Sequence, residues 1–259
     1  MRTSMLAVAV ILTAVFLAGC YVNVNGGGFK ASFTRSETLT APLTDITSLD
    51  VNTNVGKIEL KTGDVAEAQI TAQIKVKADS EEKAQELAER VRVEVEPSGR
   101  TLVIKAEKPS GFGRNELAVD FTIVAPAALA IKATTNVGDI YVTDFTGRVE
   151  ARCDVGQVTC TGLRGDADLH TNVGNVRAEY SPDAPAAISV DASANVGDVE
   201  LRGPKDISAK VAAETNVGSI DSDRPLTIRG SLGKSIHASL GNGEGRIKLG
   251  SNVGSVRIR

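Results

Sequence analysis

The sequence is organised by a repeated hexapeptide, which in one copy reads Thr135-Asn136-Val137-Gly138-Asp139-Ile140. The core pattern T-N-V-G, one variable residue, then Ile or Val also occurs at Thr53–Gly56, Thr171–Gly174 and Thr215–Gly218. Looser copies are Cys153–Gly156, Ala194–Gly197 and Ser251–Gly254, with Ser231–Gly233 as a more distant one. Motifs that recur with a period near 20 residues are typical of stacked units that bury their apolar faces against one another. The pattern therefore predicts a solenoid.

Each copy is preceded by residues that alternate between apolar and polar. The odd positions Val149, Ala151 and Cys153 are apolar, whereas the even positions Glu150 and Arg152 are charged. Successive side chains of a strand point to opposite faces, so one face is buried and the other contacts solvent. The alternation resumes after the glycine, and each unit is predicted to be a strand, a bend and a second strand.

The bend itself has a structural interpretation at each position. Glycine adopts backbone conformations that are closed to other residues, and the valine is expected to be the last inward side chain before the corner. In stacked strands about 4.8 Å apart, identical amides can bond to one another as a ladder. The expected ladder residues are Asn54, Asn136, Asp154, Asn172, Asn195, Asn216 and Asn252. The expected bend residues are Gly56, Gly138, Gly156, Gly174, Gly197, Gly218 and Gly254.

The spacing of the copies favours one class of solenoid. The step from Asn136 to Asp154 and from Asp154 to Asn172 is 18 residues, and the later steps are longer. Eighteen is also three hexapeptides, as in left-handed β-helices, but inward residues do not recur every six positions here. Parallel crossovers are overwhelmingly right-handed. The predicted fold is all-β, a right-handed parallel β-helix.

A different structure is predicted between the first two exact copies. Residues 68–77 alternate as a strand, and Asp79 or Ser80 can cap a helix whose apolar residues recur at helical spacing. Strands are expected at 91–95, 102–106 and 117–124. We interpret 61–130 as an α+β insert with one short helix that covers the open edge of the first rungs, within a domain of residues 45–259 whose tandem rungs occupy 131–259.

The N-terminal residues predict an export signal. An apolar run from Met5 to Ala18 is too short to span a membrane and ends in Leu17-Ala18-Gly19-Cys20. This string resembles the bacterial lipobox, which implies cleavage after residue 19 and acylation of Cys20. Tyr21 after the cysteine implies release to the outer membrane where a cell has one. Residues 20–44 are then expected to form the lipidated cysteine and a flexible tether.

Composition agrees with an exported structural protein. Removal of residues 1–19 leaves 28 basic and 32 acidic residues, a net charge of −4. A weakly acidic chain does not favour nucleic-acid binding. No cofactor and no small-molecule substrate are indicated, and the expected partners are the membrane, through the lipid, and an unidentified component of the envelope.

Residues suited to catalysis or metal binding are few. His170 and His237 lie at outward positions of different rungs, so neither a zinc site nor a Ser-His-Asp triad is indicated. Aspartates crowd the turns, which raises calcium as an alternative, but the glycine-rich calcium-binding repeat is absent. Carboxylate pairs of the glycosidase kind stay open, although the chain has no Trp with which to stack sugar rings.

Two further groups of residues give expectations. Cys153 and Cys160 are both inward in one rung and are expected to be buried free thiols, with a disulfide as the alternative. The last rung is expected to be an uncovered edge with four outward basic residues. Their charge either repels an identical edge or forms a site for anionic envelope components. These residues are Arg246, Lys248, Arg257 and Arg259.

The combination of motifs resembles a known family. The strand Gly56–Leu60, the helix-bearing insert, the strand ending in Val124-Ala125-Pro126 and the N-V-G rungs are similar to the bacterial β-strand-repeat domain called "putative adhesin". That family more often has Gly-Ser-Gly-Asp at the corner where this chain has Asn-Val-Gly. The resemblance implies a lipoprotein or envelope protein with the fold of that family.

Together these observations favour a lipid-anchored, non-enzymatic envelope protein. Its β-solenoid surface would serve adhesion, binding or scaffolding. The alternatives are a polysaccharide-active β-helix enzyme and a sensor or shield protein of the envelope-stress response.

The lipobox interpretation predicts the fate of one variant. Only the thiol of Cys20 can accept the diacylglycerol, so Cys20→Ser is expected to abolish lipidation and leave the protein soluble after export or retained as precursor. Metabolic labelling with a clickable fatty acid measures this directly. Label that persists in the Ser variant would rule out the lipobox.

Overall fold

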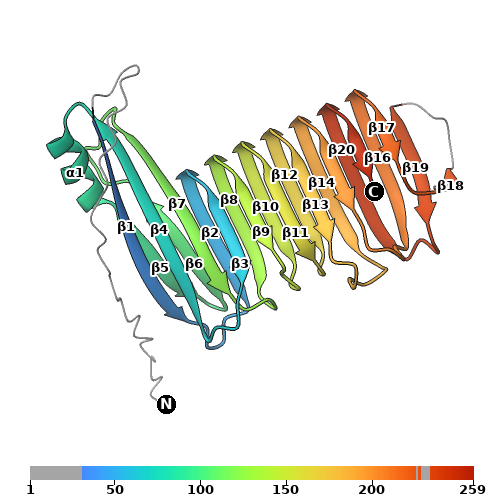
Figure 1. The fold of residues 1–259 in the computed structure, drawn as a ribbon, viewed down its shortest axis with the longest axis horizontal. Coiled ribbons are helices and arrows are strands. Elements are labelled where there is room, and N and C mark those ends of the chain that lie inside the picture. Colours follow the sequence, from blue (N-terminus) through green and yellow to red (C-terminus); the bar gives the residue numbers. More distant parts are fainter. Residues whose placement is uncertain (1–30, 226, 229–233) are drawn as a thin grey trace, which may run out of the picture.

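The structure is a computed structural model that describes residues 31–225, 227–228 and 234–259. Predictions about Cys20, the signal segment and the copy Ser231–Gly233 lie outside the described residues. The described strands form two long sheets, here called sheet A and sheet B, which face each other along the length of the molecule with the core between them (Figure 1). No helix in the described ranges is long and apolar enough to cross a membrane.

Sheet A begins at the N-terminal end of the molecule with two antiparallel pairings and is parallel thereafter. Its strands in spatial order are β1 (Ala31–Pro42), β4 (Glu67–Ala78), β7 (Glu116–Ala125), β3 (Ile58–Thr62), β9 (Ile140–Thr143), β11 (Val158–Leu163), β13 (Val176–Tyr180), β15 (Val199–Arg202), β21 (Val256–Ile258) and β17 (Ile220–Ser222).

Sheet B is parallel except at its two ends. In the same direction its strands are β5 (Arg92–Ser98), β6 (Thr101–Glu107), β2 (Ser48–Val55), β8 (Ala130–Val137), β10 (Val149–Val155), β12 (Ala167–Val173), β14 (Ser189–Val196), β20 (Gly245–Val253), β16 (Ala209–Val217), β19 (Ser235–Leu240) and β18 (Thr227–Ile228).

Each repeat gives one strand to each sheet, which confirms the predicted solenoid. β8 ends at the bend at Gly138 and continues as β9 on the other side of the molecule. Parallel pairing holds the repeats in register, so that Val149 lies between Ile131 and Ala167. The inward side chains of both sheets form one continuous apolar core, as the alternation in the sequence predicts.

The insert contains the helix α1 (Glu81–Arg90), for which Ser80 is the N-cap. The hydroxyl of Ser80 accepts a hydrogen bond from the backbone N–H of Lys83 at 3.3 Å. The apolar face of the helix packs against β1 and β4. β6 and β7 extend the two sheets beyond the first rung, so the insert covers that end of the solenoid with antiparallel strands.

The predicted boundary of the tether is wrong, because residues 31–42 form the edge strand β1. Arg35 of β1 donates hydrogen bonds to the carbonyls of Ala88 and Val91 at 2.9 and 2.6 Å, and so binds the C-terminal end of α1. It also pairs with Glu37 at 2.8 Å. These charged residues face the helix where a strand pattern requires apolar ones, and this hides the strand in the sequence.

The expectation of an uncovered last rung is also wrong. β20 and β21 lie between β14/β15 and β16/β17, so the end of the chain is an internal rung (Figure 1). Beyond β16, sheet B is extended by the antiparallel strand β19. Every corner presents the same groups to its neighbour. The sequence alone therefore does not show that the last rung inserts between two earlier ones.

Glycine is required at the bends for two reasons. The bend glycines have φ between 140° and 153°, for example 143° at Gly174. A Cβ at Gly174 would lie 2.0 Å from the carbonyl oxygen of Gly156 in the rung below. The rungs therefore stack through glycine backbones without room for a side chain.

Two glycine substitutions test this constraint. Gly174→Ala is expected to lower the free energy of unfolding by well over about 1 kcal/mol, because alanine disfavours this φ and its methyl group clashes with backbone. Gly250→Ala is the matched control, since its Cβ would have contacts no closer than 3.9 Å. Chemical denaturation measures both variants, and equal midpoints would contradict the account.

Candidate functional site

The repeated corners form one straight feature along the molecule, which we call the corner ridge. It consists of the motif residues at each passage from sheet B to sheet A, from Thr53–Gly56 to Thr215–Gly218. Backbone bonds join the corners, since each glycine N–H donates to the carbonyl of the valine in the next rung, as from Gly138 to Val155 at 2.9 Å. The backbone hydrogen bonds that pair neighbouring strands thus continue through the corners.

The first position of the motif forms a buried hydroxyl row that sequence reasoning missed. Thr171 donates to the carbonyl of Gly156 at 2.9 Å, and Ser251 donates to that of Gly197 at 2.8 Å. Cys153 points its thiol at the carbonyl of Gly138 at 3.0 Å. Ala194 has no such donor. The signal was present in the sequence, because the position is Thr in all four exact copies.

The predicted amide residues lie in one row. Nδ2 of Asn136 is 2.7 Å from Oδ1 of Asn54, and Nδ2 of Asn172 is 3.0 Å from Oδ1 of Asp154. Asn252 bonds to Asn195 at 3.2 Å, and Asn216 bonds to Asn252. All these side chains are exposed, so water competes for their hydrogen bonds and the row contributes less stability than a buried ladder.

The valine of the motif points outward, which contradicts the expectation that it is the last inward side chain. Val155 and Val173 are each 48% exposed, and Val217 at the end of the row is 61% exposed. The chain begins to turn at the asparagine, so two successive side chains face solvent and the buried position passes to the threonine. The result is a row of exposed valines, which we call the valine row: Val137, Val155, Val173, Val196, Val253 and Val217.

The residue after the glycine forms a further set of contacts. Oδ1 of Asp139 accepts the backbone N–H of Gln157 at 3.0 Å, and Oδ1 of Asp198 accepts that of Ser255 at 2.8 Å. This backbone bond and the neighbouring Arg257 hold the pKa of the Asp198 carboxyl below its usual value. These turn aspartates therefore bind the next rung. No group of three or more potential metal ligands occurs among residues 31–225, 227–228 and 234–259.

Cys153 and Cys160 are both free and buried in the structure, as expected. Burial raises the pKa of the Cys160 thiol to about 12, and it also raises that of Cys153. Neither group is suited to act as a nucleophile at neutral pH.

His170 has neighbours that the sequence did not indicate. Its Nδ1 lies 2.6 Å from Oγ of Ser193 on the adjacent strand, and its Nε2 lies 2.6 Å from Oδ1 of Asp168. Asp168 is also approached by Arg148 and Arg152, each at 3.5 Å. Oδ1 of Asp168 nevertheless lacks an aligned hydrogen bond within the described residues. The contact joins β12 to β14 on an open sheet face.

Three of the four C-terminal basic residues are neutralised by acidic neighbours. Lys248 pairs with Asp191 at 3.4 Å and Arg257 pairs with Asp198 at 2.8 Å. Arg259 lies 3.5 Å from Glu200 and 3.8 Å from Asp223. With Arg246 they belong to an internal rung, so the premise of a basic terminal edge does not hold.

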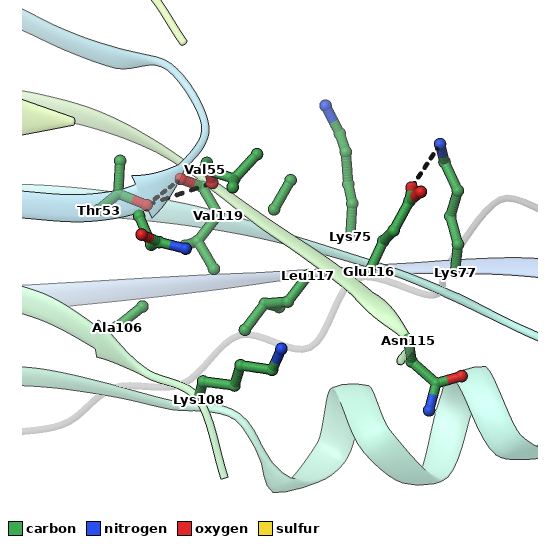
Figure 2. A pocket seen from close by; sticks show the side chains of 12 residues that line it. Thr53, Val55, Lys75, Lys77, Ala106, Lys108, Asn115, Glu116, Leu117 and Val119 are labelled. Atoms are coloured by element: carbon green, nitrogen blue, oxygen red, sulfur yellow. Dashed lines mark hydrogen bonds and ion pairs between the residues drawn. The ribbon is translucent and has the colours of Figure 1, made fainter. Parts of the chain in front are cut away.

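A cleft of about 570 Å³ opens at the N-terminal end of the corner ridge, and we call it the ridge-end cleft. Figure 2 shows it between the first corner and the strand β7. Its lining residues are Thr53, Asn54, Val55, Lys75, Lys77, Ala106, Lys108, Asn115, Glu116, Leu117, Ala118 and Val119. The lining comes from four separate segments of the chain, so no local pattern in the sequence indicates the cleft.

Comparison with known proteins shows the family. The model described as Toastrack DUF4097 matches residues 21–259. A crystal structure described as a "putative cell adhesion protein" from Clostridium sporogenes aligns with 14% identity and a TM-score of 0.53, and covers 87% of this chain and 98% of that one. A "putative adhesin" from Bacteroides fragilis aligns with 16% identity and a TM-score of 0.42 over 86% and 97%. No curated protein matches the sequence.

The hydroxyl row predicts that a threonine in place of Ala194 would stabilise the protein. Ala194→Thr is expected to donate to the carbonyl of Gly174, as Thr does in other rungs, and to exceed Ala194→Val in stability by about 1 kcal/mol. The Val variant has nearly the same size without the hydroxyl. Denaturation with guanidinium measures the difference, and a Val variant as stable as the Thr variant would show that the row contributes nothing.

Proposed function

The chain belongs to the Toastrack DUF4097 family, and from this membership and the corner ridge we propose that it is a lipid-anchored protein of the cell envelope that binds a partner without catalysis. The observation that carries the binding role is the valine row. The likeness to the Clostridium sporogenes protein establishes the fold, and an adhesive role for this chain is part of the proposal.

Attachment through Cys20 would leave the corner ridge accessible. β1 begins at Ala31, eleven positions after Cys20, and lies at one edge of sheet A. The rungs extend from that end through successive parallel strands to β17. A chain attached by Cys20 would therefore present its repeats away from the lipid, on the side of the membrane to which the lipoprotein is exported.

The valine row has the properties of a binding surface. Its members are about half exposed and lie one per rung, so that at about 4.8 Å per strand the six valines span roughly 24 Å. Contiguous exposed apolar surface on a soluble protein often marks an interaction site. The row is also rigid, because the backbone bonds between valine carbonyls and glycine N–H groups hold its spacing.

A non-enzymatic role is supported by the chemistry of the other groups. The cysteines are buried with raised pKa values. The contact of His170 with Ser193 lies on an open sheet face, and the carboxylate of Asp168 that would orient the imidazole is shared with two arginines.

Substitution of the valine row tests this proposal. A variant with Val155→Thr, Val173→Thr and Val196→Thr keeps side-chain shape and removes three exposed apolar surfaces. It is expected to bind isolated cell envelope on the order of tenfold more weakly than the wild type in a pelleting assay.

The matched control places three threonines on the outward face of sheet B, as Lys132→Thr, Glu150→Thr and Asp191→Thr. These residues are outside the ridge, and envelope binding should be retained. Envelope binding by the valine-row variant at wild-type strength would refute the proposed surface.

A further inference from the structure

The ridge-end cleft exists because two strands run past the first corner. β7 pairs with β3 only from Phe121 onward, so residues 116–120 project beyond it. β6 likewise pairs with β2 only as far as Lys105. The ends of β6 and β7 therefore extend past the first rung, and the space between the two sheets is open beside Asn54 and Val55.

The floor of the cleft is apolar. Leu117 is half-buried and packs against the core, and Val119 is almost fully buried. Ala106 closes the side that belongs to sheet B. Val55, which corresponds to the exposed valines of the other rungs, is less exposed than they are and lines this space. The floor is suited to a hydrocarbon chain rather than to a sugar or a nucleotide.

The rim of the cleft carries positive charge, with three lysines and one glutamate in the lining. Lys77 pairs with Glu116 at 2.9 Å, and Lys75 pairs with Asp120 at 2.6 Å. Lys108 differs, because it has no ion pair with a described residue and its ammonium lies 4.9 Å from the centre of the Phe112 ring. Figure 2 shows that ammonium directed toward the space that Leu117 borders.

We propose that the ridge-end cleft binds a single-chain amphiphile with an anionic head, of the fatty-acid class. The alkyl chain would lie on Val55, Ala106 and Leu117, and the carboxylate would meet Lys108. A cavity of about 570 Å³ falls within the size range of about 300–1,000 Å³ that small-molecule sites occupy. An apolar floor beside the ammonium of Lys108, which has no ion pair with a described residue, is complementary to an alkyl chain with an anionic head.

This inference is independent of the valine row and of acylation at Cys20. The cleft lies at one end of the ridge and shares no residue with the six exposed valines. Failure of one proposal therefore leaves the other standing.

Calorimetric titration of the purified chain with two ligands of equal chain length tests the proposal. Laurate is anionic and dodecyltrimethylammonium is cationic, and both are used below their micellar concentrations. We expect saturable binding of one laurate per chain, with the cation bound at least about tenfold more weakly.

Variants assign the site. Lys108→Glu is expected to weaken laurate binding by roughly tenfold or more, and Lys108→Arg to retain it, because the head group requires a cation. Leu117→Glu should abolish binding by placing a carboxylate on the floor. Val155→Glu makes the same change on the valine row outside the cleft and should leave laurate binding unaltered.

Four outcomes would overturn the proposal. These are the absence of saturable laurate binding, equal affinity for the cationic amphiphile, laurate binding by Lys108→Glu at wild-type strength, and a loss in Val155→Glu as large as that in Leu117→Glu. Lys108 is exposed, so its variants are expected to fold and keep the test decisive even if Leu117→Glu does not.

Discussion

The close approach of glycine backbones at the rung corners is the constraint on which the rest of the structure depends. A side chain at Gly138 would meet the carbonyl of Gly56 at 2.0 Å, and the same clash recurs at each bend glycine along the stack. Because glycine permits φ near 140°, the sheet ladder passes around the corner without a break. Strand spacing, the alignment of the rows and the straightness of the molecule all follow from this contact.

The same corner decides which side chains are buried and which are presented. The turn begins one residue before the valine, so the inward place goes to a threonine whose hydroxyl bonds to a glycine carbonyl, as for Thr171. Asparagine and valine are then directed outward in two parallel rows. An exposed apolar row is thus a geometric consequence of the stacking, and the proposed binding role uses a surface that the fold already creates.

The repeat pattern predicts much of this architecture and few of its functional details. Alternation and glycine spacing are local, so the strand–bend–strand units and the helix after Ser80 follow from the sequence. The position of β20 does not, because equivalent corners stack equally well in either order. The sequence pattern did not indicate β1, because Arg35 and Glu37 stand where a strand normally has apolar residues. These two side chains form an ion pair, and Arg35 also donates a hydrogen bond to the C-terminal end of α1. The ridge-end cleft depends on how far β6 and β7 overrun their neighbours, which no local pattern records.

Amide hydrogen exchange of the bend glycines tests the central claim most directly. In an ordinary surface turn these N–H groups exchange with solvent quickly, whereas here Gly138, Gly156 and Gly174 each donate to a carbonyl of the next rung at 2.9 Å. The account predicts that their amide protons in the native protein are protected as strongly as those at the centres of β10 and β12. Exchange of these glycines at the rate of exposed loop residues would contradict the stacked corner.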